Sequence, residues 1–591
     1  MFQIGQCNLF SEDDGEVFEI KEYNLFRENY DKIKNKELIR YTFSKIKTQT
    51  SELNENPHPF EVDALLDKST LNIKKNRLTF NLPLNISIAD VFEEYDNLNT
   101  EERNSVQNIP LILEENGEIL LLDILTRTDI DLIDNYDRLS SHQREFLKNI
   151  IEILNPHKKL LELLVLISNV NIYNIFIEYD KLSNDQSPVF KNIIKSLGGN
   201  SENVLRLFVG GEPGTGKSYL IKILKLWVED ILGNKIAISA PTKTGAMCIK
   251  GDTIHKLFRL PVDNDNKPSY KPLTSAELSI LRRELNDVIL FIIDDIYLVS
   301  SDLLGCIHIR LTEIYGTKGH SNCWFGGKHI LLLGDLFLYD AVAFFPPVFC
   351  KINDPFIQKQ VYETIFLTVR PNFEFNIWDL FEYDELTYNM RQEKDQNYLD
   401  LLRRLRSKTY DVKADTQIET REITANKFEC DINQLYLFER PGDCNRFNHY
   451  MLSLKSNCKI KLQAIDEIVY SENYVHPCML PEKVNYYFHL DENIIIANGS
   501  RVMLTADVGD FAAGSIANVI CVHLPDAPKL QFVTVEFDNN KRVNIYRITS
   551  QYEASDGIFY TRLQFPFILA FALTILDSLG LQLNKISDRR Y

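Results

Sequence analysis

The sequence has no closely spaced pair of cysteines, no long hydrophobic run and no excess of positive charge. None of its ten cysteines forms a Cys-x-x-Cys pair, which argues against a zinc site and predicts reduced cysteines in an intracellular protein. The longest mostly apolar stretch, Phe565–Leu576, has twelve residues, whereas a membrane-spanning helix needs about 20. The first residues are polar and acidic, unlike a secretory signal. These absences predict a soluble protein with no membrane partner.

Negative charge is concentrated at the N-terminal end of the chain. Residues 1–180 contain 33 Asp and Glu against 19 Lys and Arg, whereas the rest of the chain contains 50 against 46. The formal net charge of −18 is not that of an obvious nucleic-acid-binding protein. The nearly neutral remainder can nevertheless contain a basic groove. Residues 1–180 carry no catalytic pattern, and we predict an acidic accessory region there.

Beyond about Leu182, short apolar runs alternate with segments of helical character. This alternation is typical of a parallel sheet covered by helices. A second α/β region is expected from about Phe373, with a stretch at 501–560 that is rich in strand-forming residues. The apolar runs that we expect to be strands of the first sheet are Leu205–Val209, Ile236–Ser239, Val288–Ile293 and Ile330–Leu333.

A phosphate-binding loop (P-loop) follows the first of these runs. Residues 211–218 read Gly-Glu-Pro-Gly-Thr-Gly-Lys-Ser and fit the pattern G-x-x-x-x-G-K-[ST]. Glycines let backbone N–H groups close around a polyphosphate, and the following helix points its positive end at it. Lys217 is expected to reach the β- and γ-phosphates, and the Ser218 hydroxyl to hold Mg²⁺. The predicted nucleotide-binding residues of the loop are Gly211, Gly214, Thr215, Gly216, Lys217 and Ser218.

An acidic pair, Asp294 and Asp295, directly follows the apolar run Val288–Ile293. Asp294 is expected to bind Mg²⁺, and Asp295 stands where a water-activating carboxylate is expected. The alternative is a strand that ends in a solvated acidic turn. The P-loop upstream favours the first interpretation.

These segments resemble, in order, the motifs of the Pif family of superfamily-one 5′→3′ DNA helicases, which includes the helicase portion of Helitron-type transposons. The match runs from about residue 182 to 586, and its order makes it more specific than any single motif. The resembling segments are Leu182–Gln186 (Q motif), Ala240–Thr242 with Gly251–His255 (segment Ia), Asp294–Ile296 (D-E-I), Glu385–Gln392 (motif IV), Gly499–Leu504 (G-x-x-V-M-L) and Leu563–Ile575 (the approach to motif V).

The resemblance implies an α/β fold with two RecA-like P-loop NTPase domains. The first would span 181–370, and the second would span 371–591 and carry a small β-barrel-like insertion at about 501–560. Gln186 would read adenine, and Arg391 would reach the γ-phosphate from the second domain as a catalytic group beside Asp295. The implied partner is single-stranded DNA, bound by a monomer.

By the same resemblance, the chain would be an ATP- and Mg²⁺-dependent helicase of DNA repair, recombination, telomere maintenance or transposition. Because the family works on nuclear, mitochondrial and transposon DNA, we expect the nucleus, with the mitochondrion as the alternative.

Four positions depart from the family pattern. Asp295 stands where the family has glutamate, and Leu338 where it has the glutamine of G-D-x-x-Q. Leu576–Leu579 reads Leu-Asp-Ser-Leu where the family has H-K-S-Q, and the sequence ends at Tyr591 without a motif VI arginine. Displacement of a catalytic group by about 1 Å can cost about a hundredfold in rate. The alternative interpretation is therefore a catalytically weakened or inactive ATP-binding remnant of such a helicase.

Overall fold

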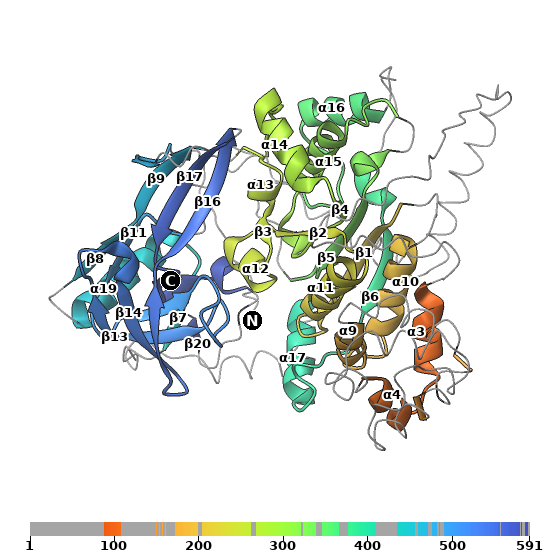
Figure 1. The fold of residues 1–591 in the computed structure, drawn as a ribbon, viewed down its shortest axis with the longest axis horizontal. Helices are drawn as coiled ribbons and strands as arrows, with labels where there is room; N and C mark the ends of the chain where they lie inside the picture. The colour runs from red at the N-terminus through yellow and green to blue at the C-terminus, as the bar shows by residue number, and fades with distance from the viewer. Residues whose placement is uncertain are drawn as a thin grey trace, which may run out of the picture. The chain divides into compact units, whose positions relative to one another are not determined.

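The computed structural model describes residues 88–107, parts of 149–198 and, with short gaps, 204–407 and 434–588, and its largest element is a six-stranded sheet (Figure 1). All of its neighbouring strands are parallel, in the order β3-β2-β4-β5-β1-β6. The four predicted strands are confirmed as β1, β2, β4 and β5, with ends shifted by two residues or fewer. The strands are β1 (Arg206–Gly211), β2 (Lys235–Ala240), β3 (Asp252–Thr253), β4 (Val288–Ile293), β5 (His329–Gly334) and β6 (Glu382–Leu386).

Helices cover both faces of this sheet, because successive side chains of its central strands are buried on opposite sides. In β4, Leu290 and Ile292 belong to one core, and Phe291 and Ile293 to the other. The first core is closed by α9 (Ile172–Tyr179), α10 (Gln186–Gly198), α11 (Lys217–Leu226), the π-helical turn η3 (Trp227–Ile231) and α12 (Lys243–Cys248). The second is closed by α13 (Ile254–Leu257), α14 (Ser275–Leu285), η4 (Ile296–Leu298), α15 (Ser301–Tyr315), η5 (Trp324–Gly327), α16 (Pro355–Ile365) and η6 (Ile377–Leu380).

Three helices of the predicted accessory region (residues 1–180) belong to the first core: α9 and two helices that precede it. From α3 (Ile88–Asp96), Phe92 packs against Phe176 of α9 and against Trp227, with ring centroids 5.8 and 5.4 Å apart. Val106 of α4 (Thr100–Gln107) is buried in the same core. The described part of residues 1–180 is therefore integral to the first sheet domain. The rest of the predicted accessory region lies outside the described residues.

The first sheet does not end at the predicted boundary after residue 370. Strand β6 pairs in parallel with β1, Leu386 lying opposite Gly211, and α17 (Gln396–Arg406) follows it. Sequence pattern alone did not indicate this strand, because Glu382–Leu386 is mostly charged or polar and only Leu386 is buried. The first domain thus includes the segment that the sequence analysis assigned to the second.

A second parallel sheet, in the order β19-β7-β20, confirms the two-sheet α/β architecture. It has one long helix, α19, whose Asn448 side chain exchanges hydrogen bonds with the backbone of Ala572 in β19. The helical turn η9 follows β19. The bounds are β7 (Leu435–Phe438), α19 (Pro441–Lys455), β19 (Ala572–Thr574), η9 (Leu576–Ser578) and β20 (Ile586–Asp588).

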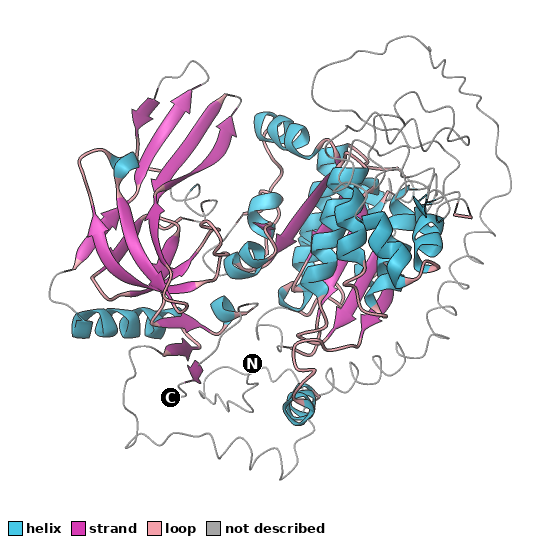
Figure 2. Cartoon of the chain, turned by 60° about the horizontal axis from the view of Figure 1, so that its bottom comes forward, coloured by secondary structure: helices cyan, strands magenta, loops and turns pink. Residues whose placement is uncertain are grey.

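Antiparallel strands follow α19 and continue to β19, and they extend well beyond the predicted insertion at 501–560 (Figure 2). Five form the order β15-β14-β13-β12-β18, four form β10-β9-β17-β16, and two form β11-β8. Their bounds are β8 (Ile460–Gln463), β9 (Ile465–Tyr470), β10 (Val475–Pro477), β11 (Asn493–Ile496), β12 (Arg501–Leu504), β13 (Ile516–His523), β14 (Phe532–Phe537), β15 (Arg542–Tyr546), β16 (Ile548–Ser555), β17 (Ile558–Gln564) and β18 (Phe567–Leu569), with the short turn η8 (Pro528–Leu530).

The described residues bear on membrane spans and on disulfides. Within them, no helix is both long and apolar enough to cross a bilayer. The seven cysteines among them are all free.

A buried histidine gives the first domain a pH-dependent stability. The ring of His308 on α15 is fully buried: its Nδ1 accepts from the Phe325 N–H at 2.9 Å, and its Nε2 lies 2.7 Å from the Thr364 hydroxyl. Burial lowers the pKa of His308 to about 3. Because the unfolded chain takes up a proton near its ordinary pKa of about 6.5, stability falls as pH falls below that value.

We expect His308 to reduce the free energy of unfolding by about 2 kcal/mol between pH 7 and pH 5. The measurement is urea unfolding at both pH values for the native chain and for His308→Gln, whose amide cannot titrate. The loss should be about 2 kcal/mol smaller in His308→Gln, whereas His320→Gln, at an exposed histidine, should leave it unchanged. An equal loss in the native chain and His308→Gln would contradict the prediction.

Candidate active site

The P-loop joins the end of β1 to the start of α11, and two of its glycines have conformations that other residues rarely adopt. Gly214 has φ 101° and Gly216 has φ 80°, in the region where a Cβ is strained. A Cβ on Gly214 would lie 2.7 Å from Oδ1 of Asn389. The loop is therefore closely enclosed by other parts of the chain, and glycine is required for that fit.

Lys217, the first residue of α11, lies in the middle of the site. Its Nζ donates to the carbonyl oxygens of Gly211 at 2.6 Å and Glu212 at 3.3 Å. Burial lowers the pKa of Lys217, and the carboxylates of Asp294, Asp335 and Asp295 oppose this effect. Among the described residues, the amine thus has three acids near it and hydrogen-bonds to backbone oxygens alone. A phosphate oxygen would be a stronger acceptor for it.

The acidic pair lies at the carboxyl end of β4. The Asp294 carboxylate accepts from the Asp295 N–H at 2.9 Å, and Asp295 has the left-handed backbone conformation, φ 52°. Burial raises the pKa of both groups, and the neighbouring Asp294 charge helps to raise that of Asp295 to about 7. A carboxylate with a pKa near neutrality can accept a proton from water. Gly245 leaves room beside it, since a Cβ there would lie 3.0 Å from Oδ2 of Asp295.

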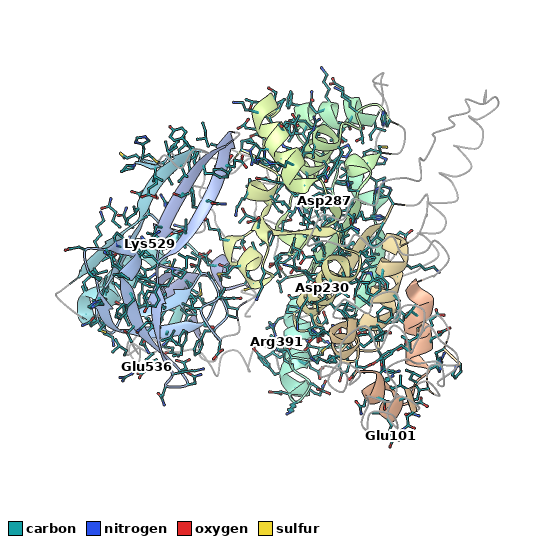
Figure 3. All side chains as sticks on the ribbon, viewed as in Figure 1. Glu101, Asp230, Asp287, Arg391, Lys529 and Glu536 are labelled. Atoms are coloured by element: carbon teal, nitrogen blue, oxygen red, sulfur yellow. The ribbon has the colours of Figure 1, made fainter. Side chains whose placement is uncertain are left out.

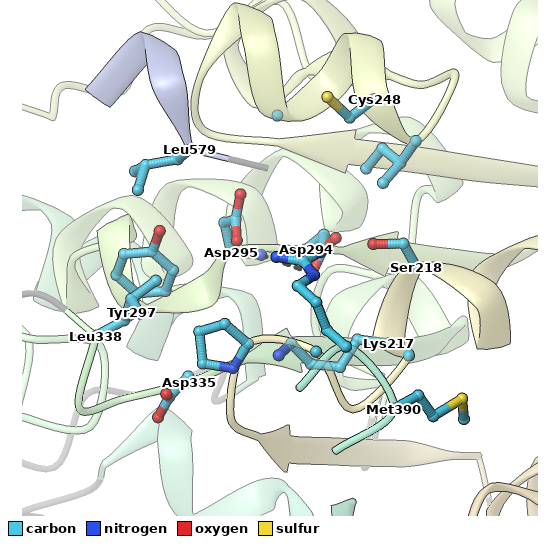
Figure 4. Close-up of a pocket in the computed structure, with 16 residues that line it drawn as sticks. Lys217, Ser218, Cys248, Asp294, Asp295, Tyr297, Asp335, Leu338, Met390 and Leu579 are labelled. Carbon is cyan, nitrogen blue, oxygen red and sulfur yellow. Dashed lines mark hydrogen bonds between the residues drawn. The ribbon is translucent and has the colours of Figure 1, made fainter. Parts of the chain in front are cut away.

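The P-loop and the acidic pair line one cavity of about 360 Å³. In the view of Figure 4, Tyr297, Leu338, Asp335 and Leu579 lie on one side of the acidic pair and Ser218 on the other. The lining residues are Pro213, Gly214, Gly216, Lys217, Ser218, Gly245, Cys248, Ile249, Asp294, Asp295, Tyr297, Asp335, Leu338, Met390, Arg391 and Leu579. Backbone donors, one lysine and several carboxylates in one hollow are the groups that bind a nucleoside triphosphate with its metal ion.

The segment after β6 closes the P-loop from the side. The Met390 N–H donates to the Gly214 carbonyl at 3.0 Å, and the Asn389 side chain donates to the Pro213 carbonyl at 2.9 Å. Arg391 follows directly and lines the cavity; its place in the chain is labelled in Figure 3. Because β6 is a strand of the first sheet, Arg391 reaches the cavity from the same domain as the P-loop, which corrects the expectation that it comes from the second.

Gln186 and Asp185 fasten this arrangement from behind. The Gln186 amide donates to the carbonyls of Thr215 and Gly216 at 3.0 and 3.2 Å. The Asp185 carboxylate accepts from the N–H groups of Thr387 and Tyr388 at 2.7 and 2.9 Å. Gln186 is fully buried and does not line the cavity. The sequence predicted that it reads adenine, but in this structure its side chain supports the P-loop backbone.

The cavity brings together most, but not all, of the predicted site residues. Gly214, Gly216, Lys217, Ser218, Asp294, Asp295 and Arg391 line it, whereas Gln186, Gly211 and Thr215 do not. The Thr215 hydroxyl donates to the Glu212 carbonyl at 2.9 Å. Gln186 and Thr215 thus hydrogen-bond to the backbone of the P-loop. The residues that line the cavity are the ones that can contact a nucleotide.

Two leucines enter the cavity at positions where the resembling family has glutamine. Leu338 follows β5, and Leu579 follows η9. Neighbouring Asp577 is held in its own turn, where its carboxylate accepts from the Thr574 hydroxyl at 2.7 Å. Both expected amides are thus replaced by apolar side chains. The inserted stretch 339–345 and Arg589 and Arg590 lie outside the described residues.

Sequence reasoning missed two arginines of α17 that pair with acids of the site. Arg403 binds the Glu212 carboxylate with its closest contact at 2.7 Å, and Arg406 binds Asp335 at 2.7 and 2.8 Å. The run 403–406 reads Arg-Arg-Leu-Arg, which on a helix is typical of a solvated basic face. Their partners are 191 and 71 residues away, and no local pattern indicated them.

The donor set fits Mg²⁺ better than a metal held by protein alone. Ser218 and Asp294 both line the cavity, and Mg²⁺ is usually bound by one or two protein groups together with substrate phosphates. Among the residues that the structure describes, no cluster of three or more His, Cys, Asp or Glu side chains could hold a metal ion. Of these two residues, Asp294 offers a carboxylate, the kind of protein group that usually binds Mg²⁺.

Residues 181–407 match the family model described as PIF1-like helicase. The chain is 25% identical over 256 residues to the ATP-dependent DNA helicase RRM3 of Saccharomyces cerevisiae, covering 41% of this chain and 32% of that protein. It is 24% identical over 327 residues to the ATP-dependent DNA helicase PIF1 of the same species, covering 54% and 34%. The chain thus spans about a third of the length of these relatives.

Two solved structures are similar over 69% of this chain. One is Pif1 helicase from Candida albicans, with 21% identity, a TM-score of 0.48 and 88% of that chain covered. The other is Pif1 from Bacteroides sp in complex with ADP-AlF4, with 22% identity, a TM-score of 0.47 and 86% covered.

Proposed function

Because the chain belongs to the PIF1-like helicase family, we propose that it is an ATP-dependent DNA helicase that moves 5′→3′ along single-stranded DNA. The observation that carries the proposal is the cavity. It combines the P-loop, the acidic pair, Asp335 and Arg391, all of which lie within the residues that match the family. Leu579, which also lines the cavity, lies outside them.

The residues of this cavity divide the chemistry among them. The P-loop backbone and Lys217 would bind the β- and γ-phosphates, and Arg391 would stabilise charge that develops on the γ-phosphate. Ser218 and Asp294 would hold Mg²⁺, which supplies charge neutralisation when it is bound. Asp295 would orient the attacking water and accept its proton, for which its raised pKa suits it.

We propose single-stranded DNA as the partner and a monomer as the form that binds it. Phosphate contacts and base stacking would give binding with little sequence preference and strong salt dependence. Two of the threonines in the Ia-like segments act as helix caps: Thr242 accepts from the Gly245 N–H at 3.0 Å, and Thr253 from the Lys256 N–H at 3.3 Å. They would hold the loops before α12 and α13 in a fixed shape for a backbone to bind. We also propose a reducing compartment, the nucleus or alternatively the mitochondrion.

The test is strand separation on tailed duplexes. We expect the chain to separate a duplex with a 5′ single-stranded tail in the presence of ATP and Mg²⁺, and to leave a 3′-tailed duplex intact. A non-hydrolysable ATP analogue is the control, because binding without hydrolysis cannot drive movement. Absence of ATP-dependent separation on both substrates, from protein that binds single-stranded DNA, would contradict the helicase proposal.

A second candidate function is that of an ATP-binding module without turnover. The observation that favours it is the pair Leu338 and Leu579, whose side chains cannot hold an attacking water. Such a module would bind ATP at the same cavity and respond to DNA without hydrolysing the nucleotide. Steady-state ATP hydrolysis with and without single-stranded DNA separates the two candidates.

A further inference from the structure

Helix α17 is attached to the site by two ion pairs one helical turn apart. Arg403 binds Glu212, and Arg406 binds Asp335, each through more than one guanidinium nitrogen. Arg406 also stacks its guanidinium on the Phe337 ring at 4.8 Å. The two pairs differ in one respect. Asp335 lines the cavity, whereas Glu212 does not.

Asp335 places a carboxylate in the wall of the cavity. It follows β5, which lies between β4 and β1 in the sheet, and its charge acts on the Lys217 amine together with those of Asp294 and Asp295. Lys217 is the group that reaches the β- and γ-phosphates. An uncompensated carboxylate beside it would repel the γ-phosphate.

Arg406 compensates this charge. Its Nε donates to Oδ2 of Asp335 at 2.8 Å and its Nη2 to Oδ1 at 2.7 Å, and the Asp335 side chain is only 1% exposed. A planar guanidinium bound at two points is a strong and directional partner for a carboxylate. The carboxylate that Asp335 presents to the cavity is therefore half of a charge-neutral Arg–Asp pair and not a bare acid.

We propose that Arg406 is a positioning residue for the γ-phosphate: by pairing with Asp335 it makes the cavity able to bind a nucleoside triphosphate in preference to a diphosphate. This inference rests on the proposed binding of ATP at the cavity and adds the group that sets the preference. Arg406 does not itself line the cavity, so its effect reaches the nucleotide through Asp335.

The test compares the affinities for Mg²⁺ with AMP-PNP, a triphosphate analogue, and for Mg²⁺ with ADP. Arg406→Ala should lower the ratio of triphosphate to diphosphate affinity by roughly tenfold, because the bare carboxylate repels the extra phosphate. Adding Asp335→Asn should restore the ratio, and Arg406→Lys should largely keep it. Arg403→Ala removes the other ion pair of the same helix and should leave the ratio unchanged.

An unchanged ratio in Arg406→Ala, or an equal change in Arg403→Ala, would overturn the inference and leave the proposed function intact. If the native chain binds neither nucleotide, the proposed function fails, and this inference fails with it. If Arg406→Ala does not fold, Asp335→Asn alone replaces it. That variant leaves the arginine facing a neutral amide and should shift the ratio toward the triphosphate, so an unchanged or lower ratio would also overturn the inference.

Discussion

Lys217→Ala should remove most of the affinity for ATP and reduce ATP turnover to background. Lys217 is a cation in the wall of the cavity, and within the described part of the chain its amine donates to the carbonyls of Gly211 and Glu212 alone. Truncating one member of a buried charge pair costs about 2–5 kcal/mol, which corresponds to a loss of roughly 30- to 5,000-fold in affinity. Equilibrium binding of a fluorescent ATP analogue measures the loss directly.

The matched control for this variant lies on the same helix. Lys222 pairs with Glu178 at 2.9 Å and its side chain is 56% exposed, so Lys222→Ala should bind ATP as the native chain does. Thermal unfolding of both variants checks that each is folded. Equal ATP affinity in Lys217→Ala and the native chain would show that nucleotide is bound elsewhere.

Asp295→Glu combined with Leu338→Gln should raise ATP turnover at least tenfold, which is about 1.4 kcal/mol of activation free energy. Both side chains line the cavity, and the two changes introduce the longer carboxylate and the amide that the resembling family has. Each would help to hold the attacking water, and positioning by a methylene's length can change a rate about a hundredfold.

The single changes need not add, because residues that act on one transition state are coupled. The control is Leu338→Asn, whose amide is shorter by one methylene and should give a smaller increase. Steady-state hydrolysis with saturating single-stranded DNA is the measurement. A double variant that binds ATP and DNA but remains at the Lys217→Ala background would support the module without turnover and count against the helicase.

The parts of the site that sequence reasoning located are those with a local signature. A P-loop is a contiguous pattern after a strand, and the pair Asp294-Asp295 closes an apolar run, so both were found together with the four central strands. The first sheet was expected to end too early because β6 is a half-exposed, acidic strand whose only signal is its pairing with β1. Apolar periodicity cannot reveal such a strand.

Long-range polar contacts were the second feature that could not be predicted from the sequence. The hydrogen bonds from Gln186 to the P-loop and from Arg406 to Asp335 form between segments that are distant in the sequence. The sequence around each of these residues contains no pattern that would indicate the contact. The same holds for Phe92, whose place in the first core follows from packing against α9 and Trp227. Phe92 lies in the acidic stretch 1–180, for which the composition predicted an accessory region separate from the sheet domain.

The bonds between the P-loop and the segment after β6 have a consequence for synthesis on the ribosome. Asn389 binds the Pro213 carbonyl across 176 residues of sequence, so the P-loop leaves the ribosome long before the segment that fixes it. At about 5–20 residues per second, the interval is roughly 9–35 s. During that time the edge of β1 that β6 later covers is open, and a nascent chain at this stage offers an unpaired strand to chaperones or to neighbouring chains. The P-loop is therefore enclosed only after β6 has left the ribosome and paired with β1.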